Sequence, residues 1–275
     1  MTHRVKEQLI YAFVNGNEGG NPSYVIATED SASLADECVS IAVREKCEVT
    51  HLNFDNRSGS ASVRFYVAAG PIAFCGHGTL AAASSASSIG RASTMLRLDF
   101  GEGTIDVLID QRTGLIGYME PAGRVDDVPL NQALLTQFRL AFRLPDLGEE
   151  QLSVSIGGSI RAKALIRFVL SDSLSCLAID PERRDQLCTQ LGVTGLYPFH
   201  VVDHGKVMAR HFPIGSGHNE DMATGNIAAT VAEFLMPSRN RSLEIMQGGK
   251  LCNVSRLVVG PTTHGWLVSG WCRTA

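Results

Sequence analysis

The sequence predicts an α+β protein with two similar halves, and two observations lead to this prediction. First, apolar and polar residues alternate with a period of two in several short segments, most clearly between Ile160 and Phe168, whereas helical patterns are few and isolated. Second, a pattern of strand, glycine turn and small-residue helix occurs twice. Mostly antiparallel sheets, each rolled around one central helix, fit both observations.

The first half opens with strand and turn signals. Residues 15–22 are rich in glycine and asparagine and end in a proline, which predicts a turn or loop. The next segment has helical spacing, with Leu34, Cys38 and Ile41 on one stripe, and Ser31 or Ser33 is its expected N-cap. Together these patterns predict strands at 7–14, 23–27, 45–54 and 61–67 and a helix at 31–44.

Two hairpins follow in the chain. The first has strands at 104–109 and 115–119, and the second has strands at 152–156 and 159–170 on either side of Gly157-Gly158. Between the hairpins, the charged segment from Pro121 to Pro129 is bounded by prolines and is the expected linker. The predicted organisation is therefore one half at 1–120, a second at 121–265 and a C-terminal strand or tail at 266–275.

The internal repeat supports two related halves. In the first half, Arg64-Phe65-Tyr66 precedes a glycine-containing loop, Cys75-Gly76-His77 and a small-residue run at 80–86. In the second half, Arg210-His211-Phe212 precedes a similar loop, Thr224-Gly225-Asn226 and an apolar run at 227–234. The match is short, but a duplicated pair of domains is its natural interpretation.

Composition excludes several classes of partner. The chain has 275 residues with 44% hydrophobic residues and a formal net charge of −4, so nothing in it attracts nucleic acid or an anionic membrane. The N-terminus lacks the apolar core of a signal peptide, which predicts a cytoplasmic protein. Seven scattered cysteines without a C-x-x-C pair favour reduced, mostly buried thiols over zinc or disulfides.

The two glycine turns are the strongest candidates for a binding site. The start of a helix has backbone N–H groups without intrahelical partners and carries partial positive charge, which suits a carboxylate. Glycine at 76 and at 225 would let a ligand approach the backbone closely. The alternative is that both are ordinary turns between a strand and a helix.

Several segments resemble the phenazine biosynthesis PhzF-like family. The resemblance rests on Gly20-Asn21-Pro22, on Cys75-Gly76-His77-Gly78-Thr79-Leu80-Ala81, on Glu220-Asp221-Met222-Ala223-Thr224-Gly225-Asn226 and on Gln247-Gly248. It implies the diaminopimelate epimerase-like fold, with two similar domains and the active site between them. It also implies a homodimer and an isomerase that needs no cofactor.

The resemblance also implies roles for individual residues. It makes Glu48 the acid/base that moves a proton, with His77 and Asp221 orienting the substrate and stabilising developing charge. The expected substrate is a small carboxylate-bearing metabolite, and a carboxyl group that loses hydration on burial becomes a usable acid/base near neutral pH. The residues expected to bind this substrate are Asn21, Cys75, Gly76, Gly78, Thr224, Gly225 and Asn226.

Each assignment has a structural alternative. Glu48 could be a solvated strand residue, His77 a structural histidine and Asp221 a helix cap. Related epimerases place one cysteine on each face of the reacting carbon, and here Thr224 occupies the second position, whose hydroxyl is too weak an acid for that role. Epimerisation or β-elimination by Cys75 alone, or a binding protein without catalysis, stays open.

Other motifs point away from further chemistry. The irregular spacing of His200, His204, His211 and His218 favours surface or core histidines over metal ligands. No phosphate-binding glycine motif is present, so no nucleotide is expected. Cys47, Met222 and Asn226 replace residues usual in the family, and the last two changes put the identity of the substrate in question.

Overall fold

The computed structural model describes residues 3–29, 33–56, 60–159, 161–215, 219–249 and 253–275. The chain forms two compact units, of which unit 1 comprises Met1–Met119 and Val268–Ala275, and unit 2 comprises Glu120–Leu267. The segment predicted as a C-terminal strand or tail at 266–275 contains a strand at Gly265–Thr274, and its residues from Val268 on belong to unit 1. The predicted α+β class is confirmed.

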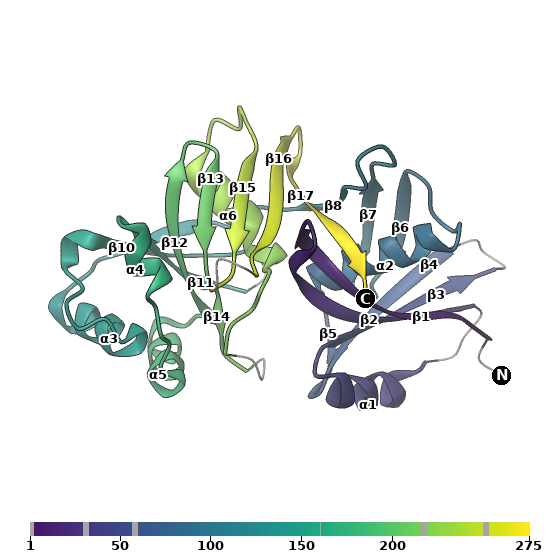
Figure 1. The fold of residues 1–275 in the computed structure, drawn as a ribbon, viewed down its shortest axis with the longest axis horizontal. Helices are drawn as coiled ribbons and strands as arrows, with labels where there is room; N and C mark the ends of the chain where they lie inside the picture. The colour runs from purple at the N-terminus through teal and green to yellow at the C-terminus, as the bar shows by residue number, and fades with distance from the viewer. Residues whose placement is uncertain (1–2, 30–32, 57–59, 160, 216–218, 250–252) are drawn as a thin grey trace. The chain divides into compact units, whose positions relative to one another are not determined.

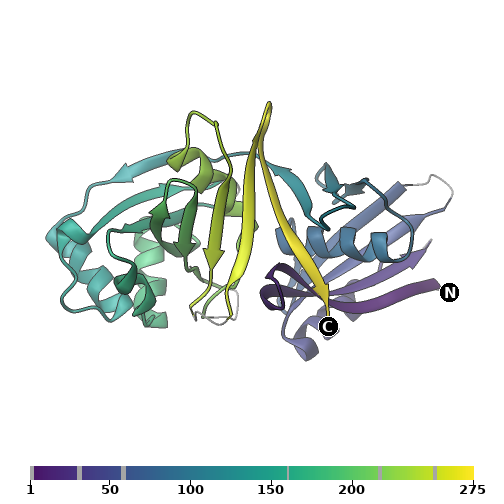
Figure 2. The ribbon, with the colours of Figure 1, turned by 45° about the horizontal axis from the view of Figure 1, so that its top comes forward.

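Unit 1 is a ring of strands around one helix (Figure 1). Around the ring, each strand pairs with the next in the order β17, β1, β2, β3, β4, β6, β7 and β8, and β8 pairs with β17. Figure 2 shows β17, in yellow, ending beside β1, in purple. The bounds are β1 His3–Asn15, β2 Glu18–Glu29, β3 Glu48–Asp55, β4 Ser60–Val67, β5 Gly70–Ile72, β6 Met95–Asp99, β7 Thr104–Ile109, β8 Ile116–Glu120 and β17 Gly265–Thr274.

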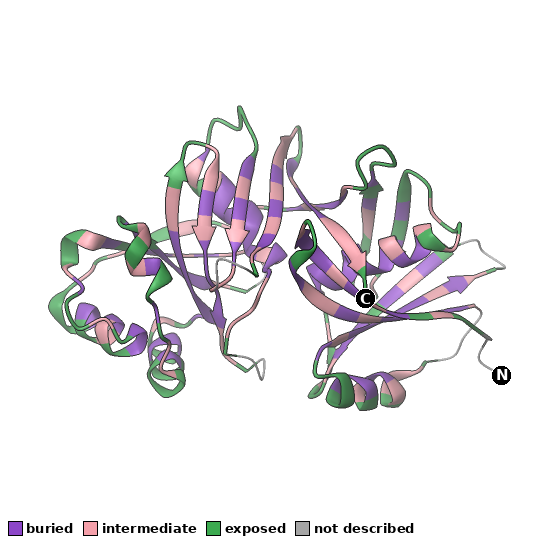
Figure 3. Ribbon diagram, viewed as in Figure 1, coloured by how far each residue is buried: buried purple, intermediate pink, exposed green. Residues whose placement is uncertain are grey.

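The central helix of unit 1 is α2 (Gly76–Ser88), and almost all of its first three turns is buried. Its alanine, serine and glycine side chains are small, so strands can pack closely against it on several sides. The second helix, α1 (Ala35–Glu45), lies against β3 and β4 and buries only one stripe, which includes the predicted Cys38 and Ile41. Figure 3 shows this difference between the two helices.

Two expectations for unit 1 need correction. The predicted turn or loop at 15–22 is shorter than expected, because β2 begins at Glu18 and pairs with Asn15, which leaves a tight turn. Gly16 supplies the positive φ of 63° that such a turn favours. The N-cap of α1 is Leu34 without a side-chain cap, although the Ser33 hydroxyl accepts a hydrogen bond from the N–H of Ala35, and Ser31 lies outside the described residues.

Gly76 shows why packing requires glycine at the start of α2. A Cβ built on Gly76 would lie 2.2 Å from the hydroxyl oxygen of Tyr118, which is fully buried on β8. We expect Gly76→Ala to lower the free energy of unfolding by about 1–3 kcal/mol through overpacking, as measured by urea denaturation. Gly260→Ala, whose added Cβ would lie 3.5 Å from the hydroxyl oxygen of Ser242, is the matched control. Equal stability of both variants would contradict this account.

Unit 2 repeats the strand pairing of unit 1. Its strands pair in the order β9, β10, β11, β12, β13, β15 and β16, and β14 also pairs with β12. The parallel pairs are β11–β12 and β13–β15, in the same relative positions as β2–β3 and β4–β6 of unit 1. The bounds are β9 Val125–Val128, β10 Leu152–Gly157, β11 Lys163–Phe168, β12 Gly195–Asp203, β13 Lys206–Ala209, β14 Phe212–Pro213, β15 Leu243–Gln247 and β16 Ser255–Thr262.

The helices of unit 2 cover its sheet differently. The buried helix α6 (Gly225–Leu235) connects β13 and β14 to β15, as α2 connects β4 and β5 to β6 in unit 1. A separate apolar core lies under α3 (Gln132–Phe142) and α5 (Pro181–Leu191), with Phe138, Phe142 and Phe168 among its members. The short elements are α4 (Ser171–Ser175) and η1 (Glu149–Gln151). The expectation of few helices is confirmed, although α3 and α5 were not predicted individually.

The connection between the halves also differs from its prediction. The segment from Pro121 to Pro129 is not a bare linker, because it contains β9, which pairs antiparallel with β10. The hairpin of β10 and β11 is present, but β11 starts at Lys163 and not at Ser159. Ile160 lies outside the described residues.

Candidate functional site

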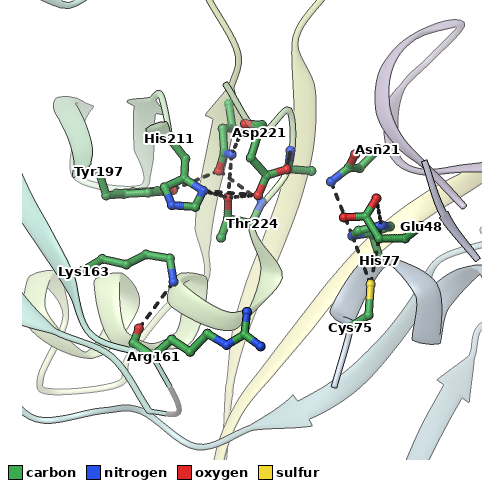
Figure 4. A network of polar contacts seen from close by, with 12 residues as sticks. Asn21, Glu48, Cys75, His77, Arg161, Lys163, Tyr197, His211, Asp221 and Thr224 are labelled. Atoms are coloured by element: carbon green, nitrogen blue, oxygen red, sulfur yellow. Dashed lines mark hydrogen bonds and ion pairs between the residues drawn. The ribbon is translucent and has the colours of Figure 1, made fainter. Parts of the chain in front are cut away.

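In unit 1, three elements bring four of the expected site residues together. Glu48 is the first residue of β3 and lies beside Ser23 of β2, on the strand that also carries Asn21. Cys75 is the N-cap of α2, and His77 is the second residue of that helix. The strand start and the helix start thus converge, and Figure 4 shows the four side chains facing one another.

The ring of His77 lies at the centre of this unit 1 cluster. Its Nε2 lies 3.4 Å from Oε2 of Glu48, and its Nδ1 lies 3.3 Å from the amide nitrogen of Asn21 and 3.4 Å from Sγ of Cys75. His77 is 8% exposed, whereas the Glu48 side chain is 22% exposed. The carboxylate therefore keeps contact with solvent while its partner is enclosed.

The charge of His77 depends on these neighbours. Burial by itself disfavours the imidazolium, but Cys75 and Glu48 together outweigh this effect, so the pKa of His77 is raised well above its usual value. A protonated His77 places positive charge 3.4 Å from the Glu48 carboxylate. The two side chains can thus form an ion pair.

The titration of His77 tests this electrostatic coupling. We expect Glu48→Gln to lower the pKa of His77, because the variant removes one of the charges that offset burial. The measurement is an NMR titration of the histidine ring signals in both proteins. His51 is an internal control in the same unit, since its pKa is lowered by burial and by Arg64. An unchanged pKa of His77 would contradict the assignment.

The glycine turn of α2 is already hydrogen-bonded within the protein. The backbone N–H of Gly78 donates to Sγ of Cys75 at 3.4 Å, and the N–H of Thr79 donates to the carbonyl of Cys75 at 2.9 Å. Cys75 therefore caps the helix besides contacting His77. The space beside Gly78 is filled by Thr50 and Phe65, so this glycine also has a packing role.

In unit 2, Asp221 is the centre of a second cluster. Its backbone N–H donates to the carbonyl of His211 at 2.9 Å, which forms an isolated β-bridge. Its carboxylate accepts from the hydroxyl of Thr224 at 2.7 Å and from Nδ1 of His211 at 3.2 Å. Backbone and side chain together hold Asp221 in one place.

Two further residues complete the unit 2 cluster. The side-chain amide of Gln247 on β15 donates to the hydroxyl of Thr224 and to the carbonyl of Asp221, both at 2.8 Å. Its amide oxygen accepts from the backbone N–H of Thr224 and from the hydroxyl of Tyr197. Gln247 is fully buried, so its side chain links the turn before α6 to the sheet.

An ion pair lies next to the unit 2 cluster. Arg210 and Glu220, each one residue before the bridged His211 and Asp221, form a two-pronged contact at 2.9 and 2.8 Å. Arg210 also donates to the carbonyl of Leu177 at 2.7 Å. This pair ties the two segments that carry the cluster to one another.

The hydrogen bonds determine which nitrogen of His211 carries a proton. The single proton of the Thr224 hydroxyl is donated to Asp221, so at the contact of 2.8 Å between Thr224 and His211 the ring must donate from Nδ1. Nε2 is buried and has no hydrogen-bond partner among the described residues. Burial lowers the pKa of His211, which Asp221 offsets only in part, and the ring is thus neutral.

Sequence reasoning missed two buried charged residues of unit 2. Lys163, at the start of β11, is 2% exposed, and Glu120, at the end of β8, is 3% exposed. Burial lowers the pKa of Lys163 to about 8 and raises that of Glu120 to about 7. The available signal was a charged residue at the end of an apolar strand, which is too common to identify a site.

The remaining expected residues lie at the start of α6. Gly225 and Asn226 are its first two residues, and Oδ1 of Asn226 is buried without a hydrogen-bond partner among the described residues. Of the three expected catalytic residues, Glu48 and His77 belong to unit 1 and Asp221 to unit 2. Each unit thus contains its own cluster of polar groups.

Two features are absent from the described residues. They contain no group of three or more histidine, cysteine or acidic side chains that could hold a metal ion. None of their helices is long and apolar enough to cross a lipid bilayer. His218 and Cys252 lie outside the described residues.

Solved structures with the same fold place the chain in a class. A predicted epimerase from Pseudomonas aeruginosa has a TM-score of 0.76 at 19% identity, with 99% of this chain and 97% of that chain covered. A hydroxyproline epimerase from Agrobacterium vitis has a TM-score of 0.60 at 12% identity, with 98% and 90% covered. The fold is therefore that of the epimerase-like proteins, as expected.

The sequence match is more specific. Residues 10–265 match the phenazine biosynthesis-like protein family, and the chain belongs to that family. A phenazine biosynthesis protein of the PhzF family from Bacillus anthracis has a TM-score of 0.80 at 16% identity, with 100% of this chain and 97% of that chain covered. No curated protein matches the sequence closely enough to count as a relative.

Proposed function

We propose that the protein is an isomerase that moves a proton, and with it a double bond, within a small carboxylate-bearing metabolite. Membership of the family and the epimerases among its structural neighbours support an isomerase-like or epimerase-like role. The observation that carries the finer proposal is the contact of 3.4 Å between Glu48 and His77. It pairs a partly exposed carboxylate with an enclosed imidazole of raised pKa.

The proposed reaction has two steps. The Glu48 carboxylate takes a proton from a carbon of the substrate, and the electron pair of the broken C–H bond spreads into the adjacent unsaturated system. The protonated Glu48 then returns the proton to another carbon on the same face, and the double bond shifts. All atoms and electrons balance without a cofactor, and His77 stabilises the ionised form of Glu48 before the first step.

The unit 2 cluster suits recognition of the substrate. A fixed Asp221 carboxylate can accept a hydrogen bond from an amino or hydroxyl group, and the start of α6 offers N–H groups to an anion. This favours an amino-acid-like or cyclic carboxylate. Residence in the cytoplasm and assembly as a homodimer stay predictions from the sequence.

Isotope exchange tests the proposal. The protein is incubated in deuterated water with a panel of small cyclic and amino-acid-like carboxylates, and NMR follows deuterium and double bonds. We expect a product with a shifted double bond and deuterium at the carbon that is newly protonated. Tight carboxylate binding without turnover across the panel would instead indicate a binding protein.

One contact favours a second candidate reaction, epimerisation or β-elimination by Cys75. Sγ of Cys75 lies 3.4 and 3.5 Å from the two ring nitrogens of His77, so a positively charged ring lies next to the sulfur. Epimerisation or β-elimination by Cys75 would place deuterium at an α-carbon. Its activity would be lost in Cys75→Ser and kept in Glu48→Gln, which is the opposite of the result that we expect.

A further inference from the structure

Two buried groups of unit 2 have hydrogen-bonding capacity that the described residues do not use. The ammonium of Lys163 has three N–H donors, and its one hydrogen bond among the described residues goes to the carbonyl of Arg161 at 3.3 Å. Nε2 of His211 is a buried acceptor without a partner in that part of the chain. Lys163 is 2% exposed and His211 is 3% exposed, so bulk water does not satisfy either group.

The strand register places these groups on one face of the sheet. Ala164 of β11 pairs in parallel with Leu196 of β12, so Lys163 lies beside Gly195. A Cβ on Gly195 would lie 2.6 Å from Nε2 of His211, which means that the ring covers this glycine. Because paired residues point to the same face, Lys163 lies on the face that His211 covers. Figure 4 shows both side chains in this part of unit 2.

The chemistry of the two groups limits what can lie between them. An ammonium needs an acceptor, and the Nε2 lone pair of a ring protonated at Nδ1 needs a donor. A carboxylate could satisfy Lys163 but not His211, and an apolar group would satisfy neither. A hydroxyl oxygen or a water oxygen accepts one hydrogen bond and donates another.

We propose that Lys163 and Nε2 of His211 form a subsite for one hydroxyl oxygen, which accepts from the ammonium and donates to the imidazole. The oxygen is supplied by a bound water or by an alcohol group of a substrate. The subsite shares His211 with the Asp221 cluster, and occupying it would fix the ring that faces Asp221. It is independent of the proposed reaction, and its test uses no turnover.

The surrounding charges agree with this assignment. The groups that act on Lys163 are Asp221 and Glu120, which favour its charged form, and Arg161, which opposes it. Burial lowers the pKa of Lys163 to about 8, which still leaves most of it protonated at pH 7. Lys163 also lowers the pKa of His211, while Asp221 and Glu220 raise it. A charged donor and a neutral acceptor therefore coexist near neutral pH.

Nitrogen NMR of the full-length protein measures the state of Nε2 directly. With ¹⁵N-labelled histidine, and His211→Gln to assign the signal, we expect Nε2 to show the upfield shift of a hydrogen-bonded acceptor. In Lys163→Met this signal should move downfield to the position of a free acceptor. Glu120→Gln, which alters a neighbour of Lys163 but keeps the ammonium, should leave it unchanged.

Two small acids identify the source of the oxygen. Lactate carries a hydroxyl group and propionate lacks it, so a change of the Nε2 signal with lactate alone indicates an alcohol group. No change with either acid, together with a bonded Nε2, indicates a water, and both results support the subsite. A wild-type signal typical of a free acceptor would overturn it, as would a signal in folded Lys163→Met that is unchanged from the wild type. If Lys163→Met does not fold, the wild-type spectrum by itself decides whether the subsite exists.

Discussion

Replacing Glu48 by glutamine is expected to lower kcat/KM for the isomerisation by about 10²–10⁴, the usual contribution of general acid/base catalysis. The amide has the shape of the carboxylate but cannot accept a proton from carbon. Because His77, Cys75 and Asn21 stay in place around the glutamine, substrate binding should change little. The expected signature is a loss in kcat with KM nearly unchanged, measured on the substrate that isotope exchange identifies.

The control for this experiment is Glu45→Gln. Glu45 is the last residue of α1, three positions before Glu48, and it pairs with the exposed Arg44. This variant removes the same charge outside the cluster, so its kcat/KM should stay within a few-fold of the wild type. A Glu48→Gln protein that retains full activity would end the proposal that Glu48 moves the proton.

Glu120 is expected to make stability depend on pH in a particular window. Burial raises its pKa from 4.5 to about 7, although its hydrogen bond from Ser159 at 2.8 Å offsets part of the shift. Between these values the folded protein keeps a proton that the unfolded chain has lost. The free energy of unfolding therefore falls as pH rises from about 4.5 to about 7, by about 3 kcal/mol from this residue.

Lys163 acts in the opposite direction at higher pH. Burial lowers its pKa from 10.5 to about 8, so between these values the unfolded chain holds a proton that the folded protein has lost. Its contribution to the free energy of unfolding consequently rises with pH in that window. The joint contribution of Glu120 and Lys163 to the free energy of unfolding should therefore be lowest between about pH 7 and pH 8.

Chemical denaturation at a series of pH values checks both slopes. Glu120→Gln should remove the fall below pH 7 and leave the rise above pH 8. The difference between the variant and wild-type profiles removes the contributions of the other titrating groups, which both proteins share. Glu182→Gln is the control, because Glu182 lies at the exposed start of α5. Identical pH profiles for Glu120→Gln and the wild type would show that Glu120 is not buried as a titrating carboxyl.

The two helices that were not predicted, α3 and α5, carry local signals in the sequence. Asn131 caps α3 by accepting from the N–H of Leu134, and apolar residues follow at helical spacing. Asp180 caps α5, Pro181 occupies its first turn and Gly192 ends it in the left-handed conformation. These signals depend only on residues within one turn of each other, which is why a sequence can reveal them.

The candidate site was likewise predicted only in part. Glu48, His77 and Asp221 were predicted because they lie in short motifs whose order and spacing resemble a family. The contacts that hold the cluster residues in place were not predicted, since Asn21 contacts His77 from 56 positions away, and Gln247 contacts Thr224 from 23 positions away. Hydrogen bonds across strands depend on register, which no local pattern specifies.

The sequence by itself determined the α+β class and the repeated order of strand, glycine turn and helix, and it singled out Glu48 as the candidate acid/base. These follow from periodicities and motifs that short stretches of chain contain. Only the tertiary structure decided the raised pKa of His77, the neutral ring of His211 and the burial of Lys163 and Glu120. The physical reason is that desolvation and charge–charge contacts depend on which strands pack together, and residues distant in sequence make those contacts.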